Sequence, residues 1–244
     1  MVVECVRRSW ETYRKNTISF IIAELISLVI TGMIALVGVW IVFNSIGISS
    51  LMDLYNLELL VRKIVSILPL LTELAISLVF FFIAGVVRAF MNAGLYGMAA
   101  ESLRGRIKVD MMFQSTKNFG FKGIISSMIV GIIAFVLFMI LVIGLNVFFP
   151  LTGGMIGFVI FFLIILTFSL VYPGIVVDGL SSTKAIQESF SVSKKNYFEI
   201  LGLLLFYALM SLVALIPLIG IFIFCFVIAP MMRISLVFFY KRKK

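Results

Sequence analysis

The stretch Lys194-Lys195-Asn196-Tyr197 separates two kinds of sequence. The preceding residues, Ser182–Ser193, are predicted to form a short helix with a polar face, and the following residues, Ile200–Met232, carry almost no charge. The same basic–asparagine step occurs at Lys15-Asn16 and at Lys117-Asn118, each time ahead of an apolar run. We interpret each step as the point at which a surface segment turns into a lipid bilayer.

The composition is typical of an integral membrane protein. Hydrophobic residues make up 63% of the 244 residues, charged residues make up 13%, and the mean hydropathy is +1.24. Soluble domains are about half apolar and about a quarter charged. A membrane-crossing helix needs about 20 apolar residues, and the chain offers six such runs that use most of its length. The sequence therefore predicts an all-α polytopic membrane protein, with residues 1–244 forming a single integral membrane domain.

The predicted spans pair into three hairpins, each led by a short amphipathic helix at the cytoplasmic interface. The spans cover approximately residues 17–43, 69–100, 123–145, 155–177, 198–216 and 221–240, and the leading helices lie within 1–16, 107–116 and 182–193. Residues 1–100, 101–178 and 179–244 would then be repeat units, with coincidence as the alternative. The middle unit is the weakest copy, and its Met111, Met112 and Phe113 are expected to face lipid. Pro173 and Pro230 should bend the fourth and sixth spans, because proline removes a backbone hydrogen bond.

The basic residues predict the orientation of the chain and its partners. All lysines and arginines except Arg62 and Lys63 fall on one side of the predicted spans. The positive-inside rule therefore predicts a multi-pass protein of the cell membrane with both termini in the cytoplasm. The net charge of +9 lies next to the apolar runs. It indicates contacts with anionic lipid headgroups at the cytoplasmic face and not with nucleic acid. The sequence does not decide whether the chain also binds a protein partner or forms a homo-oligomer.

Four ionisable residues within the spans form the candidate polar site: Glu24, Arg88, Arg233 and Glu73. Inserting each such group into a bilayer costs about 2.5–3.5 kcal/mol, so each is expected to have a structural or functional role. We expect Glu24 to pair with Arg88 or, failing that, with Arg233. The pair would be either structural or part of a substrate or proton site. Glu73, near the outer end of the second span, is equally open to a structural and a functional role.

Small residues recur in the second span at steps of four: Gly85, Ala89, Ala93 and Gly97. Such spacing lets the backbones of two helices approach closely. We favour packing within the bundle over a dimer interface.

The chemistry-bearing residues do not assemble into a catalytic set. The chain has no histidine, and its two cysteines, Cys5 and Cys225, lie at opposite ends. No metal, cofactor or enzymatic activity is therefore predicted. The expected role is a non-catalytic membrane protein that binds lipid or a membrane protein partner. The alternative is a small transporter or channel with a cytoplasm-facing polar site at Glu24, Arg88 and Arg233. A polar pocket lined by Glu24 and open to the cytoplasm would favour it.

The last 70 residues carry a recognisable pattern. Its elements are Val176-Val177-Asp178, Lys184–Phe190, Lys195-Asn196, Ile216-Pro217, Ala229-Pro230 and Tyr240. The pattern resembles the YciC-like six-span membrane protein families of unassigned function, and it is similar to the membrane domain attached to some glycerophosphodiester phosphodiesterases. The resemblance implies a six-span architecture and no catalytic residues.

Overall fold

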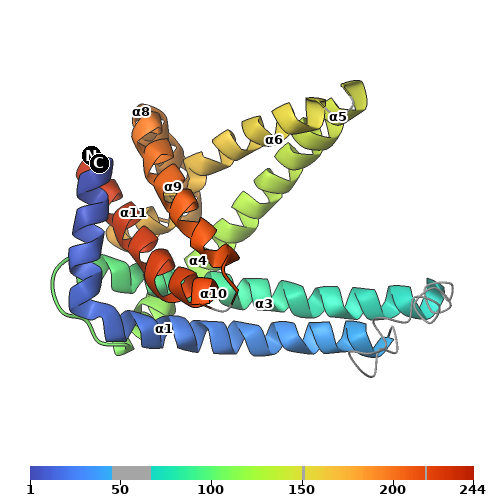
Figure 1. The fold of residues 1–244 in the computed structure, drawn as a ribbon, viewed down its shortest axis with the longest axis horizontal. Coiled ribbons are helices and arrows are strands. Elements are labelled where there is room, and N and C mark those ends of the chain that lie inside the picture. The colour runs from blue at the N-terminus through green and yellow to red at the C-terminus, as the bar shows by residue number, and fades with distance from the viewer. Residues whose placement is uncertain (46–66, 150–151, 218) are drawn as a thin grey trace. The chain divides into compact units, whose positions relative to one another are not determined.

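The computed structural model describes residues 1–45, 67–149, 152–217 and 219–244. These residues form α-helices joined by short 3₁₀ and π-helical turns, and no strand occurs among them (Figure 1). Within the same ranges, six helices are long and apolar enough to cross a membrane: Val2–Asn44, Leu74–Ser102, Asp110–Val147, Thr152–Asp178, Tyr197–Leu215 and Ile219–Lys243. The predicted all-α polytopic fold is confirmed, and the chain is a multi-pass membrane protein.

The described residues group into two compact units. Unit 1 comprises Met1–Leu25 and Ala89–Lys244, and unit 2 comprises Ile26–Arg88. Helices α1 (Val2–Ser45) and α3 (Ile67–Ser102) each contribute residues to both units. Within unit 2, a Cβ atom built on Gly38 of α1 would lie 3.2 Å from Cβ of Phe80 on α3. The two arms of the first hairpin therefore pack closely at this glycine.

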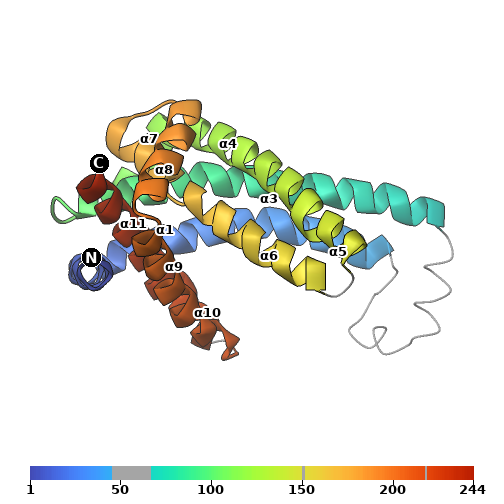
Figure 2. The same ribbon diagram turned by 90° about the horizontal axis from the view of Figure 1, so that it is seen from above.

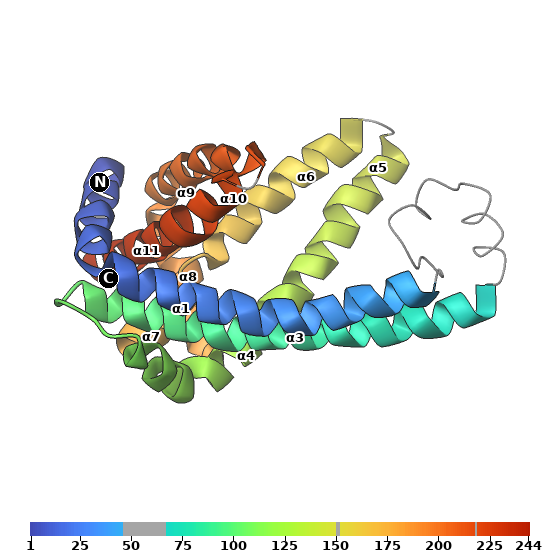
Figure 3. The same ribbon diagram turned by 60° about the horizontal axis from the view of Figure 1, so that its bottom comes forward.

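The second and third hairpins lie entirely in unit 1 (Figure 3). The second is built from α4 (Asp110–Phe138), η2 (Met139–Gly144), α5 (Leu145–Phe148), α6 (Thr152–Ile165), η3 (Leu166–Phe168) and α7 (Val171–Asp178). The third is built from α9 (Tyr197–Ser211), η4 (Leu212–Leu215), α10 (Ile219–Ile223), η5 (Phe224–Ile228) and α11 (Ala229–Lys243). A Cβ atom on Gly157 would overlap the carbonyl oxygen of Leu141, and one on Gly220 would overlap that of Val213. Each hairpin thus closes on a glycine that brings one arm against the backbone of the other.

Two of the three basic–asparagine steps break a helix. Asn16 interrupts α1 at φ −128° and ψ 17°, and Asn196 separates α8 (Ser182–Lys195) from α9 at φ −123° and ψ 32°. Both side-chain amides donate a hydrogen bond to the carbonyl four residues earlier, Thr12 at 3.1 Å and Val192 at 3.0 Å. A helix break thus marks two of the three positions at which a surface segment was predicted to turn into a span. At Asn118 the side chain is exposed and α4 continues without a break.

The middle leading segment also differs from its prediction. Residues 107–116 do not form a separate amphipathic helix, because α4 begins at Asp110 and continues directly into the third span. Met112, expected to face lipid, is fully buried. Its backbone and side chain lie against Gly94 of α3, where a Cβ atom would come within 3.1 Å of the Met112 Cγ. The missing side chain of Gly94 makes the space that Met112 occupies.

The three leading segments share one packing rule within unit 1. Residues 2–15, residues 110–117 and α8 each lie against the second span of a hairpin. Ser115 lies against Gly97 of α3, and α8 lies against η3. The first segment lies against the sixth span, where Ser235 of α11 donates a hydrogen bond to the Cys5 carbonyl at 3.2 Å. The second leading segment therefore packs on the first hairpin and the third packs on the second hairpin. The first leading segment packs on the third hairpin.

The apolar core beside α8 is formed by Val171 and Ile175 of α7 with Ala185 of α8. Helices α7 and α8 pack side by side next to the beginning of α4 (Figure 2). Gly179 ends α7 with φ of +66°, a left-handed conformation that glycine adopts at little cost. This residue lets the chain reverse from α7 into α8.

Hydroxyl groups of α8 satisfy the backbone where the fourth span breaks. The break falls at η3 and the turn that follows it. It was expected at Pro173, but Pro173 sits in the first turn of α7, where proline is tolerated. The Thr167 carbonyl accepts hydrogen bonds from Ser189 at 2.7 Å and Ser193 at 3.0 Å, and the Leu170 N–H donates to Ser189 at 3.2 Å. The surface helix thus supplies the partners that the interrupted span lacks.

In the sixth span, a tyrosine hydroxyl supplies the hydrogen bond that a backbone carbonyl lacks. Pro230 has no N–H group and cannot donate to the carbonyl of Phe226, four residues earlier. The Tyr13 hydroxyl donates to that carbonyl instead, at 2.8 Å. The expected bend at Pro230 takes the form of a π-helical turn, η5, that ends immediately before α11.

Replacing Tyr13 by phenylalanine should therefore lower the free energy of unfolding by about 1–3 kcal/mol, the cost of an unsatisfied buried polar group. The cost should shrink in a Pro230→Ala background, because alanine restores an N–H that can donate to Phe226. Reversible unfolding in mixed micelles of all four variants measures this coupling. Equal costs of Tyr13→Phe in both backgrounds would contradict the account.

Candidate functional site

Two of the predicted polar residues meet in unit 1. The Glu24 carboxylate of α1 and the Arg233 guanidinium of α11 form an ion pair, and their residues are only 1% and 6% exposed. The guanidinium carbon of Arg233 also lies 6.0 Å from the ring centroid of Tyr96, within the range of a cation–π interaction. The Tyr96 ring stacks on Tyr172 with 5.1 Å between centroids.

Tyr172, which lies on α7, links this cluster to α3 and α4. Its hydroxyl donates to the Ala89 carbonyl of α3 at 3.1 Å and shares a hydrogen bond with Ser127 of α4 at 2.6 Å. The buried charges are thus held by packed aromatic rings and hydroxyl groups. The Glu24 side chain is almost fully buried in this arrangement.

Arg88 and Glu73 are the other two predicted residues. Arg88 belongs to unit 2, where it donates to the Ser27 hydroxyl at 2.8 Å. The side chain of Glu73 lies outside the described part of the chain. The expected pairing of Glu24 with Arg233, one of its two predicted partners, is observed within unit 1.

The stripe of small residues divides between the two units. Ala89, Ala93 and Gly97 face α4 in unit 1. A Cβ atom on Gly123 of α4 would lie 3.1 Å from Cβ of Ala93 and 3.4 Å from the Ala89 carbonyl oxygen. Gly85 lies in unit 2, and a Cβ atom there would meet no other atom within 4 Å. Three of the four positions thus serve packing inside the chain.

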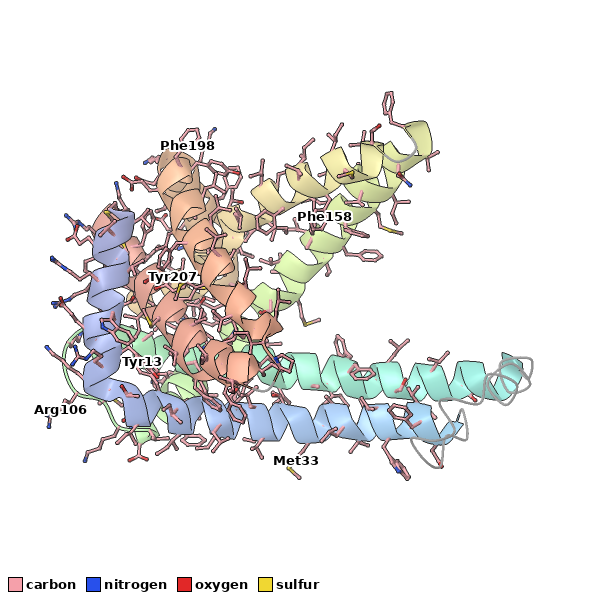
Figure 4. The ribbon with its side chains drawn as sticks, viewed as in Figure 1. Tyr13, Met33, Arg106, Phe158, Phe198 and Tyr207 are labelled. Atoms are coloured by element: carbon pink, nitrogen blue, oxygen red, sulfur yellow. The ribbon has the colours of Figure 1, made fainter. Side chains whose placement is uncertain are left out.

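A buried chain of hydroxyl groups was not predicted. Ser9 and Tyr207 share a hydrogen bond of 3.0 Å, and Tyr207 and Ser235 share one of 2.7 Å. Ser235 then donates to the Cys5 carbonyl. Tyr13 and Tyr207 can be located in Figure 4. The one sequence signal was that Ser9 and Ser189 occupy the same position before their asparagines, and both serines are fully buried.

The basic residues at positions 241–244 bind to the protein itself. Arg242 pairs with Glu4, Lys243 with Glu199 at 2.8 Å, and Lys244 with Asp178 at 2.7 Å. Lys241 donates to the Ala100 carbonyl at 3.3 Å. The hydrogen bond to Asp178 raises the pKa of the Lys244 ammonium above its ordinary value. These cations, read from sequence as headgroup contacts, hold the ends of several helices together.

Other cations remain exposed and have no ion-pair partner in the described ranges. They are Arg14, Lys15, Arg106, Lys108, Lys117, Lys184, Lys194 and Lys195. Such side chains are available to ligands outside the protein.

Four of these cations gather at the break in α1. Asn16 accepts a hydrogen bond from the Ile107 N–H at 2.9 Å and donates to the Gly105 carbonyl at 3.3 Å. Ser19 donates to the Ile107 carbonyl at 2.9 Å. These bonds bring Arg106 and Lys108 to the segment that carries Arg14 and Lys15, as the position of Arg106 in Figure 4 indicates. We call Arg14, Lys15, Arg106 and Lys108 the Asn16 cluster.

A separate basic recess of about 470 Å³ lies in unit 1, between the first leading segment, the loop after α3 and the end of α11. It is lined by Glu4, Arg8, Leu103, Arg104, Phe238, Lys241 and Arg242. Arg104 pairs with Glu101 at 2.8 Å, and Arg242 pairs with Glu4. Since most of its cations already have partners, the recess is a weaker anion site than the Asn16 cluster.

No protein-family model, curated protein or solved structure matches this chain. The resemblance to the YciC-like families therefore stays a prediction. In the part of the chain that the structure describes, no three His, Cys, Asp or Glu residues come together as metal ligands. The candidate site thus rests on the geometry of the Asn16 cluster.

Proposed function

We propose that this protein is a non-catalytic membrane protein that binds anionic lipid headgroups through the Asn16 cluster. In this proposal it resides in the cell membrane with both termini in the cytoplasm. The observation that carries the proposal is the gathering of four exposed cations that form no ion pair with the residues the structure describes. The hydrogen bonds of Asn16 hold the two segments that carry them together. Their position at the break between surface helix and span matches the level of the headgroups.

The chemistry of the cluster suits a phosphate-bearing lipid. Each basic side chain near an anionic membrane surface contributes about 1 kcal/mol to binding. Arginine can also hold a phosphate with two parallel hydrogen bonds. The buried Glu24–Arg233 pair supports a structural bundle interior over the transporter alternative.

Replacing all four cluster residues by glutamine should weaken the binding of anionic lipid by up to about a thousandfold, since about 1 kcal/mol is lost per residue. Native mass spectrometry of protein titrated with phosphatidylglycerol or phosphatidylcholine measures the bound copies. The matched control replaces Lys117, Lys184, Lys194 and Lys195 by glutamine, which removes the same charge from equally exposed positions.

The control variant should retain most of the phosphatidylglycerol. An equal loss in both quadruple variants would mean that net charge alone governs binding. Undiminished retention in the cluster variant would remove the cluster from the function altogether.

A further inference from the structure

An apolar groove of about 570 Å³ lies in unit 1 between the first leading segment and the third hairpin. It is lined by Val2, Val3, Val6, Arg7, Trp10, Phe206, Tyr207, Met210, Ile223, Val227, Ile228 and Met231. Small-molecule sites have volumes of about 300–1,000 Å³. The groove therefore has room for part of a lipid molecule.

The groove has one charged lining residue, Arg7. The Arg7 side chain is 75% exposed, and its ion pair with Glu11 is made by Nε at 3.8 Å. Such a long, solvated pair is weak, so the terminal guanidinium nitrogens can bind another anion. Trp10, 45% exposed, lies one helical turn further on. A cation and an indole ring on the wall of an apolar groove are typical of the headgroup level of a bilayer.

We infer that this groove holds one acyl chain of an anionic phospholipid, with the phosphate at Arg7. The inference deepens the proposed lipid binding and rests on it. Lipid tails are as apolar as the groove walls, so exchanging one lipid for another gains no net apolar burial. Discrimination between lipids must then come from the charge at Arg7, which favours an anionic headgroup.

Trp10 provides a direct probe of the groove. The chain has two tryptophans, and Trp40→Phe leaves Trp10 as the only one. The Trp40 side chain is highly exposed, so its replacement should be tolerated. The fluorescence of Trp10 is measured in phosphatidylcholine vesicles that contain increasing fractions of phosphatidylglycerol with brominated acyl chains. Brominated phosphatidylcholine is measured in parallel.

Brominated phosphatidylglycerol should quench Trp10 at lower mole fractions than brominated phosphatidylcholine. Arg7→Gln should reduce this preference about fivefold, the factor for one basic side chain at an anionic surface. Val227→Phe should fill the groove and abolish the preferential quenching. Val159→Phe, the same change at an exposed position on α6 outside the groove, should leave it intact.

Identical quenching curves for Val227→Phe and the parent protein would overturn the inference. So would a dimer that shields Trp10 from both brominated lipids, because a second copy of the chain would then fill the groove. Glutamine substitutions in the Asn16 cluster should leave the preference at Trp10 unchanged. The experiments therefore test lipid binding in the groove and lipid binding at the Asn16 cluster separately.

Discussion

Glu24→Gln is expected to lower the free energy of unfolding by about 3–5 kcal/mol, because it leaves the buried Arg233 guanidinium without a counter-charge. Both partners are buried inside unit 1, where the Arg233 guanidinium also lies 6.0 Å from the Tyr96 ring centroid. Reversible unfolding in mixed micelles measures the loss. Removing both charges at once, as Glu24→Leu with Arg233→Met, should recover most of the stability.

Glu11→Gln is the matched control for this change. Glu11 also pairs with arginine, at 3.8 Å from both Arg7 and Arg8, but all three side chains are about half exposed or more. Exposed pairs contribute up to about 1 kcal/mol. A similar cost for Glu11→Gln and Glu24→Gln, or no recovery in the double variant, would refute the buried pair as a source of stability.

Gly157→Ala is the second change with a large expected effect. Its added methyl group would overlap the Leu141 carbonyl oxygen, and the nearest atoms are backbone atoms that cannot rotate away. Overpacking costs about 1–3 kcal/mol, and we expect the upper end because the two arms of the hairpin must separate. Loss of stability in the same unfolding assay would be accompanied by wider separation of spin labels placed on α4 and α6.

The control, Gly131→Ala, should change stability in the opposite direction. A Cβ atom at Gly131 meets nothing within 4 Å, and Gly131 lies inside α4. Alanine in a helix interior is more stable than glycine by about 0.5–1 kcal/mol. If Gly157→Ala also stabilised the protein, the close approach of the arms at this position would be refuted.

The six spans could be predicted because hydrophobic length alone determines which segments cross a bilayer. The breaks at Asn16 and Asn196 could be predicted for a local reason as well, since both amides bond to a carbonyl in their own preceding turn. Asn118 has the same neighbours in sequence but an exposed side chain in a continuous helix. Whether such an asparagine interrupts a helix therefore depends on contacts that sequence spacing does not specify.

The candidate site was less predictable because its members come from distant parts of the chain. The sequence indicated that Glu24 needs a cation and offered Arg88 and Arg233, but sequence spacing could not show that Arg233 pairs with it. The acidic partners of Arg242 and Lys243, Glu4 and Glu199, follow from how the helix ends assemble. The Asn16 cluster likewise depends on hydrogen bonds between Asn16 and a loop about 90 residues later.

The docking of residues 2–15 on the sixth span bears on how the protein is made. Tyr13 and Cys5 bond to groups 213 and 230 residues further along the chain. At synthesis rates of about 5–20 residues per second, Tyr13 waits roughly 10–45 s before its acceptor leaves the ribosome. Residues 2–15 are thus synthesised long before the groups that fix them, and their docking must wait until the third hairpin has been made.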